Sequence, residues 1–184
     1  MTDIKRTTIA AAFMLAAGPA YASCEDAWYL RNLAFDRAGY CFGSTLGNAI
    51  FDNSDCSTKS PTLSAWDQRL VDETKRYEAS MNCKVNTNAS RLETTLMGKL
   101  DDVDLLPTLA SYESICIGFS GPDLPMRSDL GIASSYPTGE VAAGDTVRFR
   151  FESADGWDFV ETDLGAGWIP AGAITPASCR QFAG

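Results

Sequence analysis

Apolar positions in the first half of the chain recur at the spacing of α-helices. After Ser64, one stripe repeats at intervals of four, seven and four residues, at Trp66, Leu70, Tyr77 and Met81. Ser64 and Asp67 have the spacing of a capping box, which places the start of this helix. Residues 27–38 contain neither proline nor glycine, and Gly39 supplies the left-handed residue that ends many helices. The pattern therefore predicts two well-defined helices.

Two shorter helical segments are also expected. A helix over residues 45–51 would begin after Ser44, because serine is a favourable N-cap residue. Another helix is predicted over about residues 90–100, where apolar residues again recur on one helical face. The residues of that face are Leu92, Leu96, Leu100 and Val103.

After Leu106 and Pro107 the pattern changes to the alternation of β-strands. Residues 147–152 and 157–162 alternate with the period of two that is typical of half-buried strands. Short strands separated by glycine-containing turns suggest a small barrel. The predicted fold class is therefore α+β, with a small helical N-terminal domain over residues 23–109 and an all-β barrel over residues 110–184.

Residues 1–22 have the organisation of a signal peptide. A positive start is followed by a short apolar run over residues 9–17, and Ala20-Tyr21-Ala22 fits the small-x-small rule of signal peptidase. We expect cleavage after Ala22 and a periplasmic or secreted protein. Lipid attachment at Cys24 is the competing interpretation, but Tyr21 stands where lipoproteins have a leucine-like residue. No later stretch has the about 20 apolar residues of a membrane span, so no transmembrane segment is expected.

The chain has six cysteines, all of which follow the predicted leader. None forms a Cys-x-x-Cys motif or has the spacing of a zinc site, and an even number in an exported protein predicts three disulfides. Six cysteines allow many pairings, and the sequence leaves them open. The preferred set joins Cys41 to Cys56, Cys24 to Cys83 and Cys116 to Cys179. The first two bonds would tie the helical domain together, and the third would bracket the C-terminal domain.

Charge and composition narrow the classes of function. The formal net charge is −9, and about −10 without the leader, which argues against nucleic acid and anionic lipid surfaces as partners. The chain contains no histidine, the side chain most often used for proton transfer and for binding transition metals. We therefore expect no metal and no cofactor. The acidic balance is typical of a soluble surface, or of a face made for a basic partner.

Residues 30–44, Leu-Arg-Asn-Leu-Ala-Phe-Asp-Arg-Ala-Gly-Tyr-Cys-Phe-Gly-Ser, resemble the YARHG domain, a small and largely uncharacterised domain of bacterial extracytoplasmic proteins. The Tyr-Ala-Arg-His-Gly motif of that family maps onto residues 35–39. Arg37 and Gly39 match it, whereas Phe35, Asp36 and Ala38 replace the tyrosine, alanine and histidine. Any chemistry that depends on the family's histidine is therefore absent from this chain.

Residues 120–176 resemble a bacterial Src-homology-three-type barrel. Leu124-Pro125-Met126-Arg127-Ser128 is similar to its opening strand, and Gly144-Asp145-Thr146-Val147 to the next strand entry. Gly156-Trp157 and Gly167-Trp168 are similar to its paired Gly-Trp hairpin, and Ala173-Ile174 closes the pattern. The resemblance implies binding of cell-wall peptides or protein partners, without catalysis.

Two groups of side chains are candidate binding residues. Arg31, Asn32 and Arg37 could form a polar site for an acidic group, because arginine binds carboxylates bidentately, or they could instead fix the loop that follows their helix. Tyr136, Trp157 and Phe159 could line an aromatic groove on the barrel. For Trp157, packing in the core is an equal alternative.

Together these features predict a non-catalytic binding protein of the cell envelope, with peptidoglycan peptides or an envelope protein as the ligand. One alternative is a cell-wall hydrolase that uses only carboxylates, which would draw on Asp155, Asp158, Glu161 and Asp163. Another is an acidic inhibitor or accessory subunit. The alternation of residues along the strands indicates that these four carboxylates are solvated surface groups.

Overall fold

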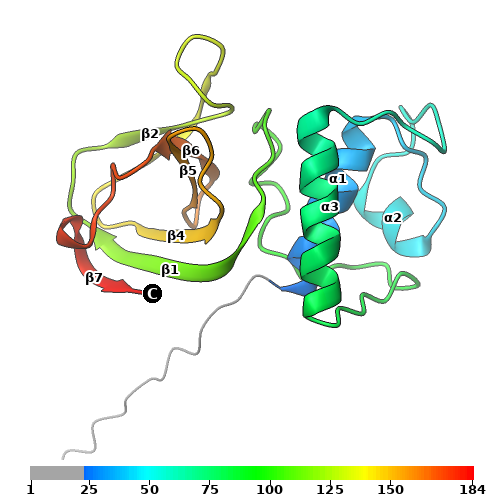
Figure 1. The fold of residues 1–184 in the computed structure, drawn as a ribbon, viewed down its shortest axis with the longest axis horizontal. Coiled ribbons are helices and arrows are strands. Elements are labelled where there is room, and N and C mark those ends of the chain that lie inside the picture. The colour runs from blue at the N-terminus through cyan, green and yellow to red at the C-terminus, as the bar shows by residue number, and fades with distance from the viewer. Residues whose placement is uncertain (1–22) are drawn as a thin grey trace, which may run out of the picture.

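The computed structural model of the protein describes residues 23–184, so the predicted signal peptide lies outside the described residues. Three helices come first: α1 (Cys24–Arg37), α2 (Thr45–Ile50) and α3 (Ala65–Ser80). Seven strands follow, and Figure 1 shows the helices gathered at one end of the molecule and the strands at the other. Among the described residues, no helix is long and apolar enough to cross a membrane.

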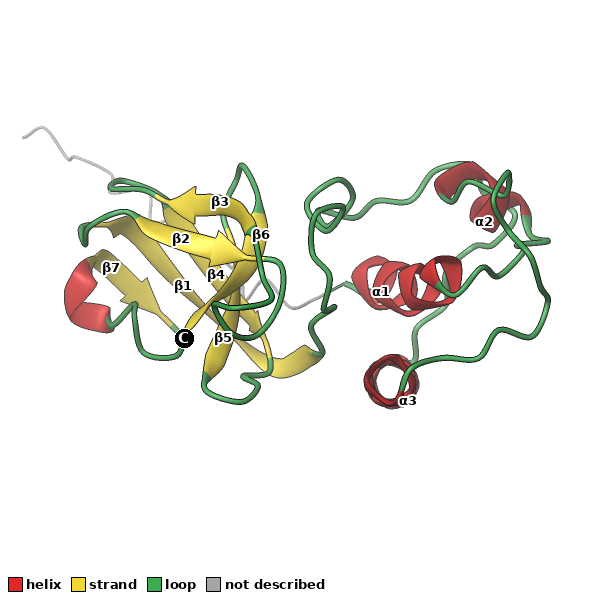
Figure 2. Cartoon of the chain, turned by 90° about the horizontal axis from the view of Figure 1, so that it is seen from above, coloured by secondary structure: helices red, strands yellow, loops and turns green. Residues whose placement is uncertain are grey.

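The strands form one antiparallel sheet in the order β3-β2-β6-β5-β4-β1-β7. Their bounds are β1 (Leu109–Phe119), β2 (Leu124–Arg127), β3 (Pro137–Val141), β4 (Thr146–Phe151), β5 (Trp157–Glu161), β6 (Ala166–Pro170) and β7 (Cys179–Ala183). A single 3-10 turn, η1 (Pro176–Ser178), precedes β7. The sheet curls strongly around its own inner face (Figures 1 and 2). The α+β class is confirmed, whereas closure of the sheet into a barrel stays a prediction.

Each helix begins at the serine that caps it. Ser23 and Asp26 form a capping box, the Ser44 hydroxyl accepts a hydrogen bond from the Gly47 amide, and the Ser64 hydroxyl accepts one from the Asp67 amide. The predicted helices over residues 27–38, over residues 45–51 and after Ser64 are confirmed, although α1 begins three residues earlier than predicted, at Cys24. Gly39, with a φ of 78°, follows the last turn of α1, as expected for a helix end.

The helix predicted over residues 90–100 is wrong, because this segment is an irregular loop. Its apolar residues are nevertheless buried, since Leu96 and Leu100 pack into the core. The hydroxyl groups of two threonines in the loop bond to charged side chains of α1 and β4, and Gly98 has a φ of 80°. These tertiary contacts hold the segment in an irregular conformation and outweigh its weak helical pattern.

The hydrophobic core has two clusters. The first joins the helices to the sheet and contains Leu30 of α1, Leu70 of α3, Phe159 of β5 and Trp168 of β6. Phe159 packs edge-to-face on Trp168, with ring centroids 5.1 Å apart. The second cluster lies within the curled sheet around Val147. The helical and strand halves therefore share buried apolar surface, which fixes one against the other.

All three disulfides have the preferred pairing. Cys24 at the start of α1 is bonded to Cys83 just beyond α3, with their Cα atoms 5.3 Å apart. Cys41–Cys56 closes the loop region around α2, and Cys116–Cys179 joins β1 to β7, with Cα distances of 4.9 and 5.4 Å. The first bond holds α1 and α3 side by side, which positions one wall of the site described below.

Candidate functional site

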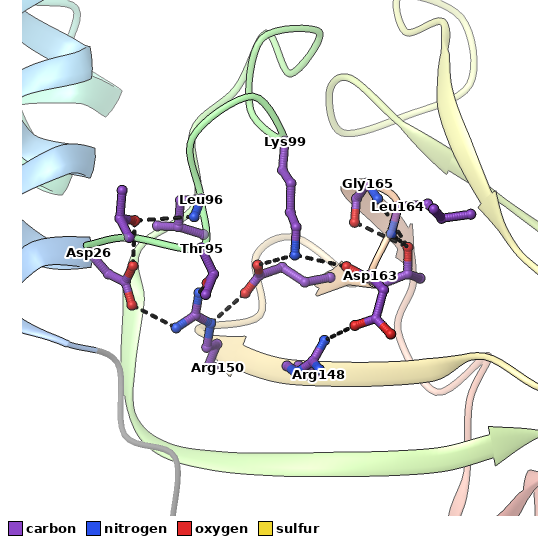
Figure 3. A network of polar contacts seen from close by, with 12 residues as sticks. Asp26, Thr95, Leu96, Lys99, Arg148, Arg150, Asp163, Leu164 and Gly165 are labelled. Carbon is purple, nitrogen blue, oxygen red and sulfur yellow. Dashed lines mark hydrogen bonds and ion pairs between the residues drawn. The ribbon is translucent and has the colours of Figure 1, made fainter. Parts of the chain in front are cut away.

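A buried network of charged side chains locks the helices onto the sheet (Figure 3). Arg150 of β4 bonds to Asp26 of α1 through Nη1 at 2.8 Å, and its Nε atom bonds to Glu161 of β5. The Arg150 Nη2 atom donates to the Thr95 hydroxyl at 2.8 Å. Lys99 lies 3.4 Å from Glu161, so the loop over residues 90–100 is also tied to the sheet.

The surroundings of these groups favour their charged forms. Burial by itself would raise the pKa of Asp26, but the charge of Arg150 and hydrogen bonds from Thr94 and Ser23 together lower it. For Arg150, burial works against the charged form, but contacts with Glu161 and Asp26 raise its pKa. The network is thus fully paired, and it fixes the geometry of the surface between helix and sheet.

That surface holds an elongated groove between α3 and the sheet. Its larger hollow has a volume of about 790 Å³ and lies between α3 and the segments around Thr108 and Glu152. A second hollow of about 330 Å³ shares Tyr77, Ser80 and Ser111 with the first and continues toward the end of α3. We call the two hollows together the α3–β1 groove, after the helix and strand that flank it (Figure 1).

The helix wall presents an arginine stacked on a tryptophan. The Trp66 indole is anchored because its Nε1 atom donates a hydrogen bond to the Leu106 carbonyl at 2.8 Å. The Arg69 guanidinium lies over the Trp66 ring, with Cζ 5.0 Å from the ring centroid. Arg76, about two turns further along α3, is held only loosely, 3.6 Å from Glu73. The stacked face of Arg69 leaves its N–H edge available for a carboxylate.

The sheet wall presents carboxylates. Glu152 and Asp155 lie at the end of β4 and in the turn to β5, and both are exposed. Asp155 has a φ of 46° and is followed by Gly156 with a φ of 82°, while Ala154 and Trp157 exchange backbone hydrogen bonds that close the turn. Within residues 23–184, neither the Glu152 nor the Asp155 side chain forms a hydrogen bond or ion pair.

The second hollow is more apolar and contains a partly buried acid. Met81 and Tyr112 are both about half exposed beside it. The Oε2 atom of Glu113 is buried and has no hydrogen-bond partner among the described residues. Burial raises the pKa of Glu113, with a smaller opposing effect from Arg150. This end of the groove therefore offers contact area and one acceptor atom.

The side chains of the three candidate binding residues on α1 already bond to other parts of the protein. Arg31 forms a bidentate pair with Glu78 of α3, at 3.1 to 3.2 Å. Asn32 donates to the Trp28 carbonyl at 2.7 Å. Arg37 donates to the carbonyls of Val103 and Leu100, both at 2.7 Å. These contacts correspond to the structural alternative, in which the side chains fix neighbouring segments.

The three aromatic candidates are not gathered in one surface groove. Phe159 is only 1 % exposed and belongs to the first core cluster, because the helical segment covers that face of the sheet. Trp157 is half-buried against the same cluster. Tyr136 is exposed in the loop before β3, and its hydroxyl lies 3.3 Å from Asp104. Neither Trp157 nor Tyr136 lines the α3–β1 groove.

The four carboxylates of the hydrolase alternative have different surroundings. Glu161 is fully buried, which corrects the expectation that all four are solvated; Asp158 accepts a hydrogen bond from Ser153, and Asp163 pairs with Arg148 at 2.9 Å. Of the four, Asp155 alone lines the α3–β1 groove. Within residues 23–184, no group of three or more metal-binding side chains is present.

Comparison with family models assigns both halves of the chain. A model described as a domain of unknown function, DUF4453, matches residues 82–184, more than half of the chain. The protein belongs to the DUF4453 family. The YARHG domain matches residues 5–79, in agreement with the resemblance of residues 30–44. No curated protein and no solved structure matches the chain.

The DUF4453 segment contains all seven strands together with the loop over residues 82–108, and the YARHG segment contains α1, α2 and all of α3 except its last residue, Ser80. The two segments meet near residue 80, at the end of α3, whereas we placed the domain boundary at residue 110; that boundary stays a prediction. The α3–β1 groove therefore has one wall from the YARHG segment and one from the DUF4453 segment.

The sequence did not single out this groove. Trp66 belonged only to the predicted apolar stripe of its helix, and neither Arg69 nor Glu152 was a candidate site residue. Arg69 and Glu152 are 83 positions apart in the chain. No local motif links them, and only the shared core brings them to opposite sides of one hollow.

Proposed function

We propose that this DUF4453 protein is an exported, non-catalytic binding protein of the cell envelope, and that peptidoglycan peptides bind in the α3–β1 groove. The observation that carries the proposal is the pairing of an open arginine edge on one wall with unpaired carboxylates on the other. The YARHG domain is associated with secreted, peptidoglycan-binding proteins, which supports the same ligand class.

The groove suits a short peptide better than a folded partner. The larger hollow, about 790 Å³, falls within the range of small-ligand sites, roughly 300–1,000 Å³. Peptidoglycan peptides carry free carboxylates and amines, which complement guanidinium and carboxylate side chains. An envelope protein that presents an extended segment is the other ligand that the sequence suggests.

Export and the form of the sheet are part of the same proposal. We infer that a leader is removed after Ala22 and that the mature chain works in an oxidising compartment. Three disulfides and the YARHG match support an extracytoplasmic site. We also infer that the curled sheet is a bacterial Src-homology-three-type barrel, which the order of short antiparallel strands supports.

Co-sedimentation with purified sacculi tests the proposal. The exported full-length protein should sediment with sacculi, and filling the groove should abolish this. Ser80→Trp places a large ring where the two hollows meet, whereas Ala79→Trp makes a similar change at the neighbouring exposed position of α3 outside the groove. Ser80→Trp should bind at least about tenfold less, and Ala79→Trp should bind like the unchanged protein.

Each other outcome has a definite meaning. Absence of sedimentation, or equal binding by both variants, would refute a groove for peptidoglycan. Retention of an envelope protein in place of sacculi would favour the second ligand class. Release of soluble muropeptides during the incubation, lost in Asp155→Asn, would favour the hydrolase alternative.

A further inference from the structure

The α3–β1 groove places opposite charges on its two walls, and this arrangement constrains the chemistry of the ligand. Arg69, Glu73 and Arg76 lie on the helix wall, which keeps a net positive charge, and Glu152 and Asp155 lie on the sheet wall. A ligand with carboxylates alone would meet the acidic wall, and a ligand with amines alone would meet the basic one. Both walls are satisfied only when the ligand carries both groups.

Of the two arginines, Arg69 is the better placed to bind a ligand carboxylate. The ring below it is fixed by the hydrogen bond from Trp66 to Leu106, so the guanidinium plane has a rigid support. Among the described residues, Arg69 makes no ion pair or hydrogen bond, so a carboxylate would not have to displace a partner. Arg76 is already shared with Glu73 at 3.6 Å and with the Asp72 carbonyl at 3.4 Å.

The acidic wall is also ordered before a ligand binds. The amide of Glu152 donates to the Thr108 carbonyl at 2.8 Å, and the turn at Asp155 is closed by the paired backbone of Ala154 and Trp157. The buried network around Arg150 lies under the same part of β4. The two walls therefore keep their separation, and little ordering is needed when a ligand enters.

We propose that the α3–β1 groove recognises a peptide side chain that ends in both a carboxylate and an ammonium group, with Arg69 binding the carboxylate and Glu152 and Asp155 binding the ammonium. This inference rests on the proposed function and names the group that the groove distinguishes. In peptidoglycan peptides, a diaminopimelate residue carries such a group, whereas a lysine residue has the ammonium alone.

Titration calorimetry with synthetic stem peptides tests the inference. Three tetrapeptides that differ only in the third residue are compared: meso-diaminopimelate, its side-chain carboxamide, and lysine. The full-length protein should bind the diaminopimelate peptide at least about fivefold more tightly than either of the others, because a charge-assisted bidentate pair is lost. Acetylation of the side-chain amine should weaken binding similarly.

Variants test separately which residues bind the carboxylate and which bind the ammonium group. Arg69→Gln should bring the acid and carboxamide peptides within about twofold of each other, whereas Arg91→Gln, an exposed change outside the groove, should preserve the discrimination. Glu152→Gln with Asp155→Asn should remove the preference for the free amine, and Glu140→Gln is the matched control. Asparagine tolerates the left-handed backbone at position 155, so this variant should fold.

The outcomes separate this inference from the proposed function. Binding of sacculi and of all three peptides with equal affinity would overturn the inference and leave the proposed function intact. Unchanged discrimination in Arg69→Gln would also overturn it. Failure of every peptide and of sacculi to bind would remove the proposed function itself.

Discussion

Arg150 lies in a strand whose alternation predicts a solvent-facing side chain, yet it is only 6 % exposed. Glu161 on the neighbouring strand is fully buried, and the two are paired. The reason is that the loop over residues 90–100 and the start of α1 cover this face of the sheet. Two charges of opposite sign can be buried here because their ion pair offsets the cost of removing each from water.

Removing one partner of this network should be costly. Glu161→Ala would leave two cations, Arg150 and Lys99, with Asp26 as the remaining counter-charge in the network, so the free energy of unfolding should fall by about 3 kcal/mol. Asp163→Ala, in the turn after the same strand, breaks a largely exposed pair with Arg148 and should cost less than about 1 kcal/mol. Urea unfolding followed by circular dichroism measures both, and equal losses would contradict the prediction.

Asp26 should make stability depend on acid pH. Its pKa is lowered in the folded protein, because the charge of Arg150 and hydrogen bonds outweigh the effect of burial. Its contribution is therefore complete above the pKa of an unfolded aspartate, about 3.9, and is lost as the pH falls through the lower folded value. Asp26→Asn removes this titration.

The difference in unfolding free energy between the unchanged protein and Asp26→Asn should be about 3 kcal/mol at neutral pH. By pH 3 the difference should shrink by up to about 1 kcal/mol. Urea unfolding at several pH values between 7 and 3 measures it. A difference that stays constant over this range would show that Asp26 does not titrate as the structure indicates.

At the scale of elements, the sequence predicts helix ends correctly where neighbouring residues determine them. Ser44 and Ser64 mark the starts of α2 and α3, and glycine marks the end of α1, because these contacts involve residues only a few positions apart. The helix predicted over residues 90–100 is wrong because distant residues determine the conformation of that segment. Its threonines and lysine find partners on α1, β4 and β5, and no pattern within the segment itself contains that information.

The disulfides should differ in their effect on stability according to the length of chain that they close. Cys24–Cys83 spans 59 positions and Cys41–Cys56 spans 15. On the chain-entropy model, replacing the first pair by serine should cost about 4 kcal/mol and replacing the second about 3 kcal/mol. Thermal unfolding of the two double variants measures the order, and a larger loss for Cys41→Ser/Cys56→Ser would contradict the model.

At the scale of the whole molecule, the sequence predicts two halves, and the structure joins them through a shared core. Leu30 and Leu70 of the helices lie in one cluster with Phe159 and Trp168 of the strands. The α3–β1 groove exists only because of this union, since each wall belongs to a different half. Residues so far apart in the chain could not be assigned to one site from spacing or periodicity.

A shared core should make the molecule unfold as one cooperative unit. Two tryptophans, Trp28 and Trp66, lie in the helical half, and Trp157 and Trp168 lie in the strand half. In the variant Trp28→Phe/Trp66→Phe, fluorescence reports the strand half alone, while far-ultraviolet circular dichroism of the same sample is dominated by the helices. With the disulfides intact, both signals should give one urea midpoint and one slope, because separating the halves would expose the first core cluster to water. Two distinct midpoints would mean that each half is stable without the other, in which case the groove between them would be an interface between independent domains, free to open.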